Sequence, residues 1–122
     1  MKKKITSLGQ IKRLKVFNYT YEIMWIKNAP ALYRAKYPND KYDVYGWCEF
    51  AECRIYVDES LKQNIMRGCE VLLHEWIHAG HEFMGLDDKS NEEQYTELGA
   101  RIWVSYMKNN PEVFEFLLKH IK

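Results

Sequence analysis

A run of mostly apolar residues at positions 71–80 is interrupted by two histidines and a glutamate, in the order His74, Glu75 and His78. Apolar residues lie before, between and after the three polar ones, and a helix that is apolar nearly all round is buried. Burying two imidazoles and a carboxylate without partners would cost on the order of several kcal/mol. A metal ion bound by neutral imidazoles removes that cost. The pattern therefore predicts a buried helix whose polar side chains share a metal ion.

The spacing of the two histidines is that of two ligands on one face of a helix. Side chains four residues apart have Cβ atoms about 5–6 Å apart, so both imidazoles can reach one zinc ion at about 2.0–2.1 Å. Glu75 lies about 100° further round the helix. There its carboxylate can take a proton from a zinc-bound water without ligating the metal. The alternative is a pair of core histidines bonded to neighbouring groups.

A catalytic zinc needs a third protein ligand and one open position. The acidic residues of the next amphipathic helix are the first candidates. With Tyr95 at the centre of its apolar stripe, Glu92 lies about 60° from the centre, whereas Glu93 and Glu97 both lie about 160° from it. The stripe therefore favours Glu92, and Glu97 is expected to pair with Arg101 four residues on. Glu93 remains an alternative ligand, as do two loop residues, Asp87 and Asp88.

The first half of the chain predicts strands and loops. Within positions 15–27, aromatic and aliphatic residues recur at every second position from Phe17 to Trp25, which is typical of a strand with one buried face. The pattern leaves open whether Asn18 breaks this segment into a hairpin. Positions 28–46 are rich in Pro, Asn, Asp and Gly, which indicates a loop with one helical turn near positions 31–35.

A second pair of strands is expected at positions 47–57, with a turn near Ala51 and Glu52. Its clearest part is the short β-branched segment at positions 54–57. Together with the first strand, this pair predicts a small antiparallel or mixed sheet.

The segment that contains the two histidines is expected to be one long helix. Ser60 and Gln63 form a capping-box pattern at its start. The helix is expected to run to about Met84, because Gly85 fits a left-handed C-terminal cap.

Two further helices are predicted after it. Ser90 and Glu93 form a second capping-box pattern, and Asn110 with Pro111 ends one helix and begins the next. The expected fold is α+β, with the sheet packed on the long helix and two C-terminal helices, in a single domain over residues 1–122.

Composition excludes several classes of function. The chain has 122 residues and a net charge of +1, and its acids and bases are mixed. Outside a lysine cluster at positions 2–4, nothing predicts binding to nucleic acid or to an anionic membrane. No signal peptide or membrane-spanning stretch is recognisable. Three cysteines without CxxC spacing argue against disulfides and a thiolate zinc site, so we expect a reduced, cytoplasmic protein.

Four short segments form a recognisable set, namely residues 72–79, the Gly85-Leu86 pair, residues 92–95 and the closing Asn110-Pro111. Over positions 46–111, the chain resembles the small phage and prophage HExxH metallopeptidases, which look like minimal relatives of the ImmA/IrrE and SprT-like zincins. The resemblance implies a zincin core in a bacterial or phage-infected cell. It also implies that a glutamate at the start of the second helix binds zinc, and this position is Glu92 here.

The expected function is that of a zinc-dependent metallopeptidase acting on a peptide or protein. Zinc held by His74, His78 and Glu92 activates a water, and Glu75 accepts its proton as hydroxide attacks a peptide carbonyl. An edge strand beside the active helix is expected to hold the substrate by β-pairing, and positions 54–57 are the predicted strand.

Substrate contacts are expected from Arg54, Tyr56 and His81, although the sequence favours His81 as a partly exposed residue near the negative end of the helix dipole. Several side chains are candidates for stabilising the oxyanion: Tyr33, Tyr37, Tyr42, Tyr45, His81 and Tyr95. Two other classes of function stay open. One is a catalytically silent zincin-like binding module that keeps zinc for structure. The other is a nucleic-acid accessory protein, suggested only by the basic residues near the N-terminus.

Overall fold

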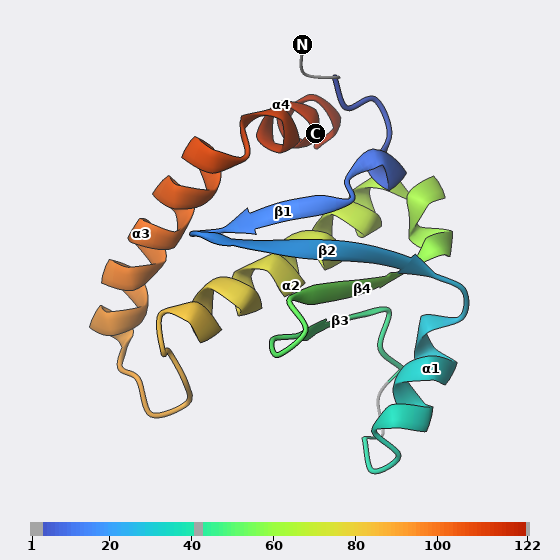
Figure 1. Ribbon diagram of the computed structural model, residues 1–122, viewed down its shortest axis with the longest axis horizontal. Coiled ribbons are helices and arrows are strands. Elements are labelled where there is room, and N and C mark those ends of the chain that lie inside the picture. The colour runs from blue at the N-terminus through green and yellow to red at the C-terminus, as the bar shows by residue number, and fades with distance from the viewer. Residues whose placement is uncertain (1–3, 41–42, 122) are drawn as a thin grey trace.

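The computed structural model describes residues 4–40 and 43–121 and has an α+β fold (Figure 1). Its four-stranded mixed sheet has the strand order β1-β2-β4-β3. β1 (Arg13–Val16) pairs antiparallel with β2 (Tyr19–Ile26), β2 pairs parallel with β4 (Arg54–Asp58), and β4 pairs antiparallel with β3 (Gly46–Glu49). The predicted α+β class is confirmed.

The alternating segment at positions 15–27 is a hairpin. Phe17 and Asn18 form its turn, and Phe17 has a positive φ of 57°, as two-residue hairpin turns require. The ring of Phe17 stacks on Phe83 with the centroids 4.4 Å apart. The hairpin turn is therefore packed against the end of the long helix.

The edge strand beside the long helix is β3, so the prediction that positions 54–57 form the edge is wrong. These positions belong to β4, which lies between β2 and β3. Parallel strands need a crossover connection, and the chain after β2 forms α1 (Ala29–Lys36) before it returns through β3. The predicted turn between the second pair of strands is confirmed.

The start of α2 (Ile65–Phe83) differs from the prediction, and its end agrees with it. Ser60 lies in a short 3-10 helix, η2 (Glu59–Gln63), and does not cap α2. The side chain of Asn64 caps α2 by accepting from the amide of the third helical residue. At the other end Gly85 has a φ of 71°, the left-handed conformation expected of a C-terminal cap.

The two C-terminal helices are α3 (Glu92–Asn109) and α4 (Pro111–His120), and the boundary between them is as predicted. The capping box at the start of α3 is shifted by one residue from the prediction at Ser90. Asn91 and Gln94 form it, because each side chain bonds to the main-chain amide of the other.

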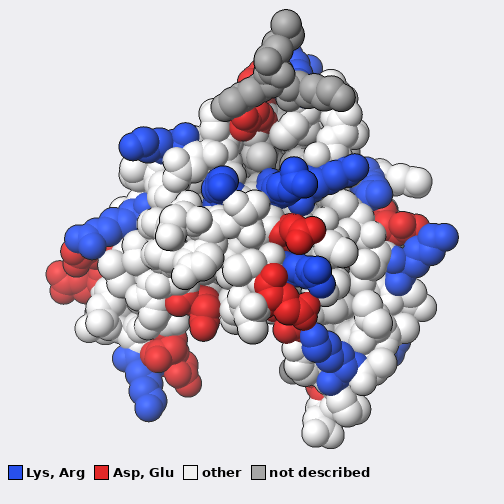
Figure 2. All heavy atoms as spheres, in the orientation of Figure 1, with Lys and Arg blue, Asp and Glu red and all other residues white. Residues whose placement is uncertain are grey.

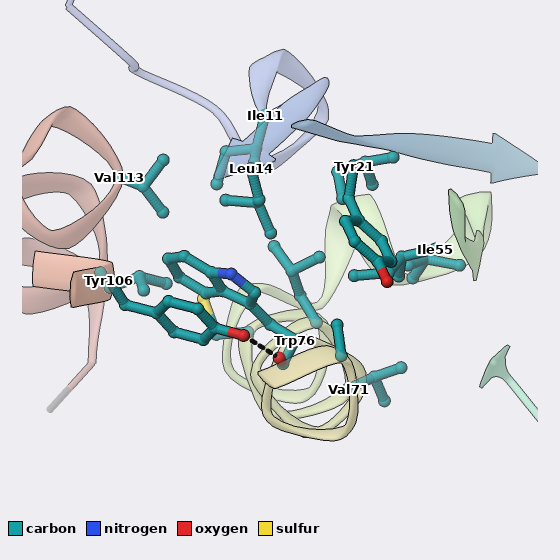
Figure 3. Close-up of a cluster of buried hydrophobic side chains, with 14 of the residues drawn as sticks. Ile11, Leu14, Tyr21, Ile55, Val71, Trp76, Tyr106 and Val113 are labelled. Atoms are coloured by element: carbon teal, nitrogen blue, oxygen red, sulfur yellow. Dashed lines mark hydrogen bonds between the residues drawn. The ribbon is translucent and has the colours of Figure 1, made fainter. Parts of the chain in front are cut away.

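The core lies between the sheet and the helices, and α2 crosses behind the strands in Figure 1. Its largest fully buried side chains include Trp76 and Tyr106, whose rings lie side by side in Figure 3. Leu14 and Ile55 from the strands and Leu72 from α2 complete this part of the core. Within residues 4–40 and 43–121, no helix combines the length and apolar character that crossing a bilayer requires.

The other face of the sheet carries charge. Arg13, Glu22, Arg54 and Glu49 follow one another across the four strands, and Lys36 of α1 extends the row by an ion pair of 2.8 Å with Glu49. Figure 2 shows basic and acidic groups alternating over the middle of this face. Opposite charges on directly paired residues stabilise the pairing of strands.

Candidate metal centre

His74, Glu75 and His78 form a motif on α2, and its two imidazoles converge on the open face of this helix. The Nε2 atoms of His74 and His78 lie 3.0 Å apart. Two ligands of one tetrahedral zinc ion, each at about 2.0–2.1 Å, are about 3.3–3.4 Å apart, so the observed separation is close to that of a ligand pair. His74 is 67% exposed at its side chain, and His78 is also exposed. The prediction of all-round burial is therefore wrong for the two histidines, because the sheet covers only one side of α2.

Glu75 is the buried member of the motif. It is 8% exposed, and its Oε2 lies 4.0 Å from Nε2 of His74. Burial raises the pKa of its carboxyl to about 7. β3 causes part of this burial, since a Cβ added to Gly46 would lie 3.5 Å from Cγ of Glu75 and 2.6 Å from Cγ1 of Val71. Only a glycine at this position lets the strand lie so close to the helix.

Tyr106 of α3 holds the middle of the motif helix in place. Its hydroxyl donates to the main-chain carbonyl of Trp76 at 2.6 Å (Figure 3), and the two rings stack with centroids 4.3 Å apart. The hydroxyl also lies close to Gly80 of the same helix. A Cβ at Gly80 would lie 2.7 Å from Oη of Tyr106. The sequence places Tyr106 in the apolar stripe of α3 but gives no sign of this contact.

The acidic candidates for a third ligand lie on the exposed surface of α3. Glu92 is its first residue and Glu93 its second, and both are exposed. Glu93 does not take part in the capping box, as described above. Glu97 pairs with Arg101 at 3.2 Å, as predicted. Within residues 4–40 and 43–121, no three His, Cys, Asp or Glu side chains form a set that could hold a metal ion. The structure thus brings the two histidines together and leaves Glu92 outside the pair.

The three predicted substrate-binding residues have different positions. Arg54 and Tyr56 alternate with the fully buried Ile55 and so lie on the face of the sheet away from α2. The reason for choosing them, a place on the edge strand, does not hold. His81 is half-buried, and its ring meets that of Tyr95 edge-on at 5.2 Å.

Most of the candidate oxyanion donors already have partners. The hydroxyl of Tyr33 donates to Asp40 at 2.6 Å and that of Tyr37 to Glu49 at 2.7 Å. The hydroxyl of Tyr95 donates to the carbonyl of Asp87 at 2.8 Å. Two loop residues that were alternative ligands, Asp87 and Asp88, are exposed. Tyr42 and the lysines at positions 2 and 3 lie outside the described residues.

A pocket of about 390 Å³ opens beside the motif and is lined by His74, Glu75, Asp43, Tyr45 and Gly46 among others. We call it the motif pocket. Because its lining contains both the imidazole of His74 and the buried carboxylate of Glu75, a group bound in this pocket would contact both side chains.

A second pocket, of about 880 Å³, lies further along α2 and β3. Its lining includes Cys48 and Phe50 from the β3–β4 hairpin, Glu82 and Phe83 from the end of α2, and Tyr19 from β2. We call it the aromatic pocket. Burial, with help from the nearby charge of carboxylates, raises the pKa of the Cys48 thiol to about 12. Cys48 is therefore a neutral thiol in these surroundings.

Comparisons with protein-family models, with curated proteins and with solved structures found no match to this chain. The chemistry of the motif, rather than likeness to a known protein, therefore has to support a function.

Proposed function

We propose that the protein is a zinc-dependent peptide hydrolase in which His74 and His78 bind the metal and Glu75 is the general base. The observation that carries this proposal is the convergence of the two Nε2 atoms to 3.0 Å with a carboxylate oxygen 4.0 Å from one of them. Two neutral imidazoles are part of the donor set of many catalytic zinc sites, and an acid beside them can take a proton from a zinc-bound water. Zinc bound there would polarise a carbonyl and lower the pKa of water to about 7.

His78 and Glu75 have different roles in the proposed reaction. His78 is kept neutral because burial, with the neighbouring imidazoles, lowers its pKa, and only neutral imidazole can ligate a metal. Glu75 lies beside the imidazole pair and in the wall of the motif pocket. It can take a proton from the attacking water and return it to the leaving amine.

Glu92 remains our proposed third ligand. Tyr95, three residues later and therefore on the same side of α3, contacts His81. This contact places the first turn of α3 beside the last turn of α2. A zincin-like arrangement, in which the second helix supplies the third ligand, needs this proximity. Metal binding is expected to draw Glu92 in from the exposed position that it has here.

The edge of β3 is the proposed place for the substrate backbone. The amide of Asp58 donates to the carbonyl of Tyr45. In an antiparallel pair, the main-chain groups of the odd-numbered residues of β3 therefore bond to β4, and those of the even-numbered residues point away from β4, toward the edge of the sheet. The main-chain groups of Gly46 and Cys48 are therefore free to pair with an extended peptide. Gly46 also lines the motif pocket, so a peptide paired there would pass directly over Glu75.

The experiment is to measure zinc content by mass spectrometry and hydrolysis of a fluorogenic peptide library on the same preparations. We expect His74→Ala, His78→Ala and Glu92→Ala to lose both zinc and activity, and Glu75→Gln to keep zinc and lose activity. His120→Ala is the matched control, because His120 lies at the end of α4 and contacts Phe116.

Two results would change the proposal. If both histidine variants keep the zinc of the wild type, the metal centre is elsewhere and the proposal fails. If the wild type binds zinc through these histidines but hydrolyses no peptide, the protein is the zincin-like binding module that the sequence left open.

A further inference from the structure

The exposed aromatic side chains line the motif pocket and the aromatic pocket. Among the described residues the large aromatic side chains classed as exposed are Tyr19, Tyr37, Tyr45, Phe50 and Phe83. Tyr45 lines the motif pocket, and the other four line the aromatic pocket. Exposed apolar side chains scattered singly need no explanation, but a contiguous group beside a reactive site marks a binding surface.

The aromatic pocket is also acidic. Its lining contains Glu49 and Glu82 and no lysine, arginine or histidine. The charge of Glu49 is matched by Lys36 and by the hydroxyl of Tyr37. The exposed side chain of Glu82 makes no hydrogen bond or ion pair with any other residue that the structure describes. Aromatic faces next to an unmatched carboxylate are the surroundings that attract a cation.

The position of Glu82 sets a register with the metal centre. His74, His78 and Glu82 follow at intervals of four residues, so Glu82 lies about 6 Å beyond His78 along the axis of α2. An extended peptide rises about 3.3 Å per residue. A metal ion bound between the two histidines would lie about 9 Å before Glu82 along this axis, so a side chain two or three residues from the bond at the metal would reach Glu82.

We propose that the aromatic pocket selects a lysine or arginine side chain of the peptide substrate, two or three residues from the bond that is cleaved. Glu82 faces the cationic group, and the rings of Tyr19 and Phe83, which meet edge-on with centroids 5.7 Å apart, form an apolar wall for its aliphatic stem. The proposal rests on the proposed function for the direction of the peptide. The pocket and its charge stand without it.

The test measures binding separately from hydrolysis. Fluorescein-labelled alanine-based octapeptides that carry one arginine, at each position in turn, are titrated into zinc-loaded Glu75→Gln protein and followed by anisotropy. Matched sets carry citrulline, which is neutral and similar in shape, or norleucine, which is only apolar. We expect the best arginine peptide to bind at least about fivefold more tightly than both counterparts.

The variants locate the effect. Adding Glu82→Gln should reduce the preference for arginine to less than about twofold, and adding Phe83→Leu should reduce it in part, because an apolar group remains but the ring face is lost. Glu115→Gln is the matched control, since Glu115 is an exposed glutamate on α4, and it should keep the full preference.

Each other outcome overturns the inference. Equal binding of arginine and citrulline, equal binding of norleucine, an arginine preference that survives Glu82→Gln, or no binding of any peptide at millimolar concentration all contradict it. Failure of the proposed function would give a different result, because the His74→Ala and His78→Ala variants would then retain zinc. Hydrolysis by the wild type without an arginine preference would leave the proposed function standing and end this inference alone.

Discussion

Replacing Tyr106 with phenylalanine removes one oxygen atom from the contact that holds the motif helix. The hydroxyl donates to the carbonyl of Trp76 at 2.6 Å and both residues are 0% exposed. The ring, which stacks on Trp76, remains in the variant. The substitution therefore isolates the hydrogen bond from the packing.

The expected loss of stability follows from the burial of the two partners. A typical hydrogen bond contributes about 0.5–1.5 kcal/mol net, and a buried acceptor left without a donor costs about 1–3 kcal/mol. From these ranges we expect the free energy of unfolding of Tyr106→Phe to fall by about 2 kcal/mol. For a domain of this size that corresponds to a fall in Tm of about 8 °C.

The measurement is urea unfolding of wild type and variant in the absence of zinc, with a shift in midpoint at unchanged slope. Tyr95→Phe is the matched control, because its hydroxyl also donates to a main-chain carbonyl, at 2.8 Å, but at an exposed position. We expect the control to lose less than about 0.5 kcal/mol. Equal losses in the two variants, or no loss in Tyr106→Phe, would refute the argument that the buried hydroxyl holds α2.

Three other substitutions test the surroundings of the motif helix. Asn110→Ala should cost about 3 kcal/mol, because buried Asn110 bonds to both the amide and the carbonyl of Lys15 and a buried amide would lose its acceptor; urea unfolding measures this. Gly46→Ala should cost about 1–3 kcal/mol, because its Cβ would lie 2.6 Å from Val71, and it should also lower peptide hydrolysis by moving β3. Burial acts to raise the pKa of Asp58, but hydrogen bonds from neighbouring groups outweigh it and lower the pKa. The stabilisation by Asp58 is therefore complete above the unfolded carboxyl pKa of about 3.9 and is lost as pH falls through the lower folded value. The stability difference between wild type and Asp58→Asn should be constant above about pH 5 and shrink below about pH 4.

Two of the three have a control variant, and each has a contradicting result. Asn109→Ala changes the exposed neighbour of Asn110, and a similar loss there would show that the bonds to Lys15 contribute nothing. Gly99→Ala adds a Cβ that meets no atom within 4 Å, so it should not destabilise, and a neutral Gly46→Ala would mean that β3 does not need its close approach. A difference between wild type and Asp58→Asn that grows in acid would reverse the sign argued above.

The sequence predicts best where a single residue decides the local backbone. Gly85 and Pro111 each fix a helix boundary at the expected place. Gly85 adopts the left-handed conformation that ends a helix, and Pro111 has no amide hydrogen and so fits the first helical position. The N-caps are less certain, because several residues near each helix start are able to cap. Asn91 and Asn64 do so in place of the serines, and the start of each helix moves accordingly.

Prediction fails where the outcome depends on distant parts of the chain. The order of the strands places β4 inside the sheet, and nothing within positions 54–57 records that β2 will pair with it in parallel. Glu92 as a metal ligand stays a prediction, because the angle about its own helix concerns only one side of α3. That angle carried no information on the distance between α3 and the two histidines, which tertiary packing determines.

The burial of the motif depends both on the local sequence and on distant parts of the chain. Apolar residues surround the histidines in the sequence, yet the sheet reaches only one side of α2, so the face that carries the two histidines stays open and the acid is covered. Gly46 and Gly80 make this possible, because one admits the backbone of β3 against Glu75 and the other admits the hydroxyl of Tyr106. The strand that covers Glu75 is therefore also the strand whose edge we propose for a peptide. If that proposal holds, a displacement of β3 should change the environment of Glu75 and the position of the peptide together.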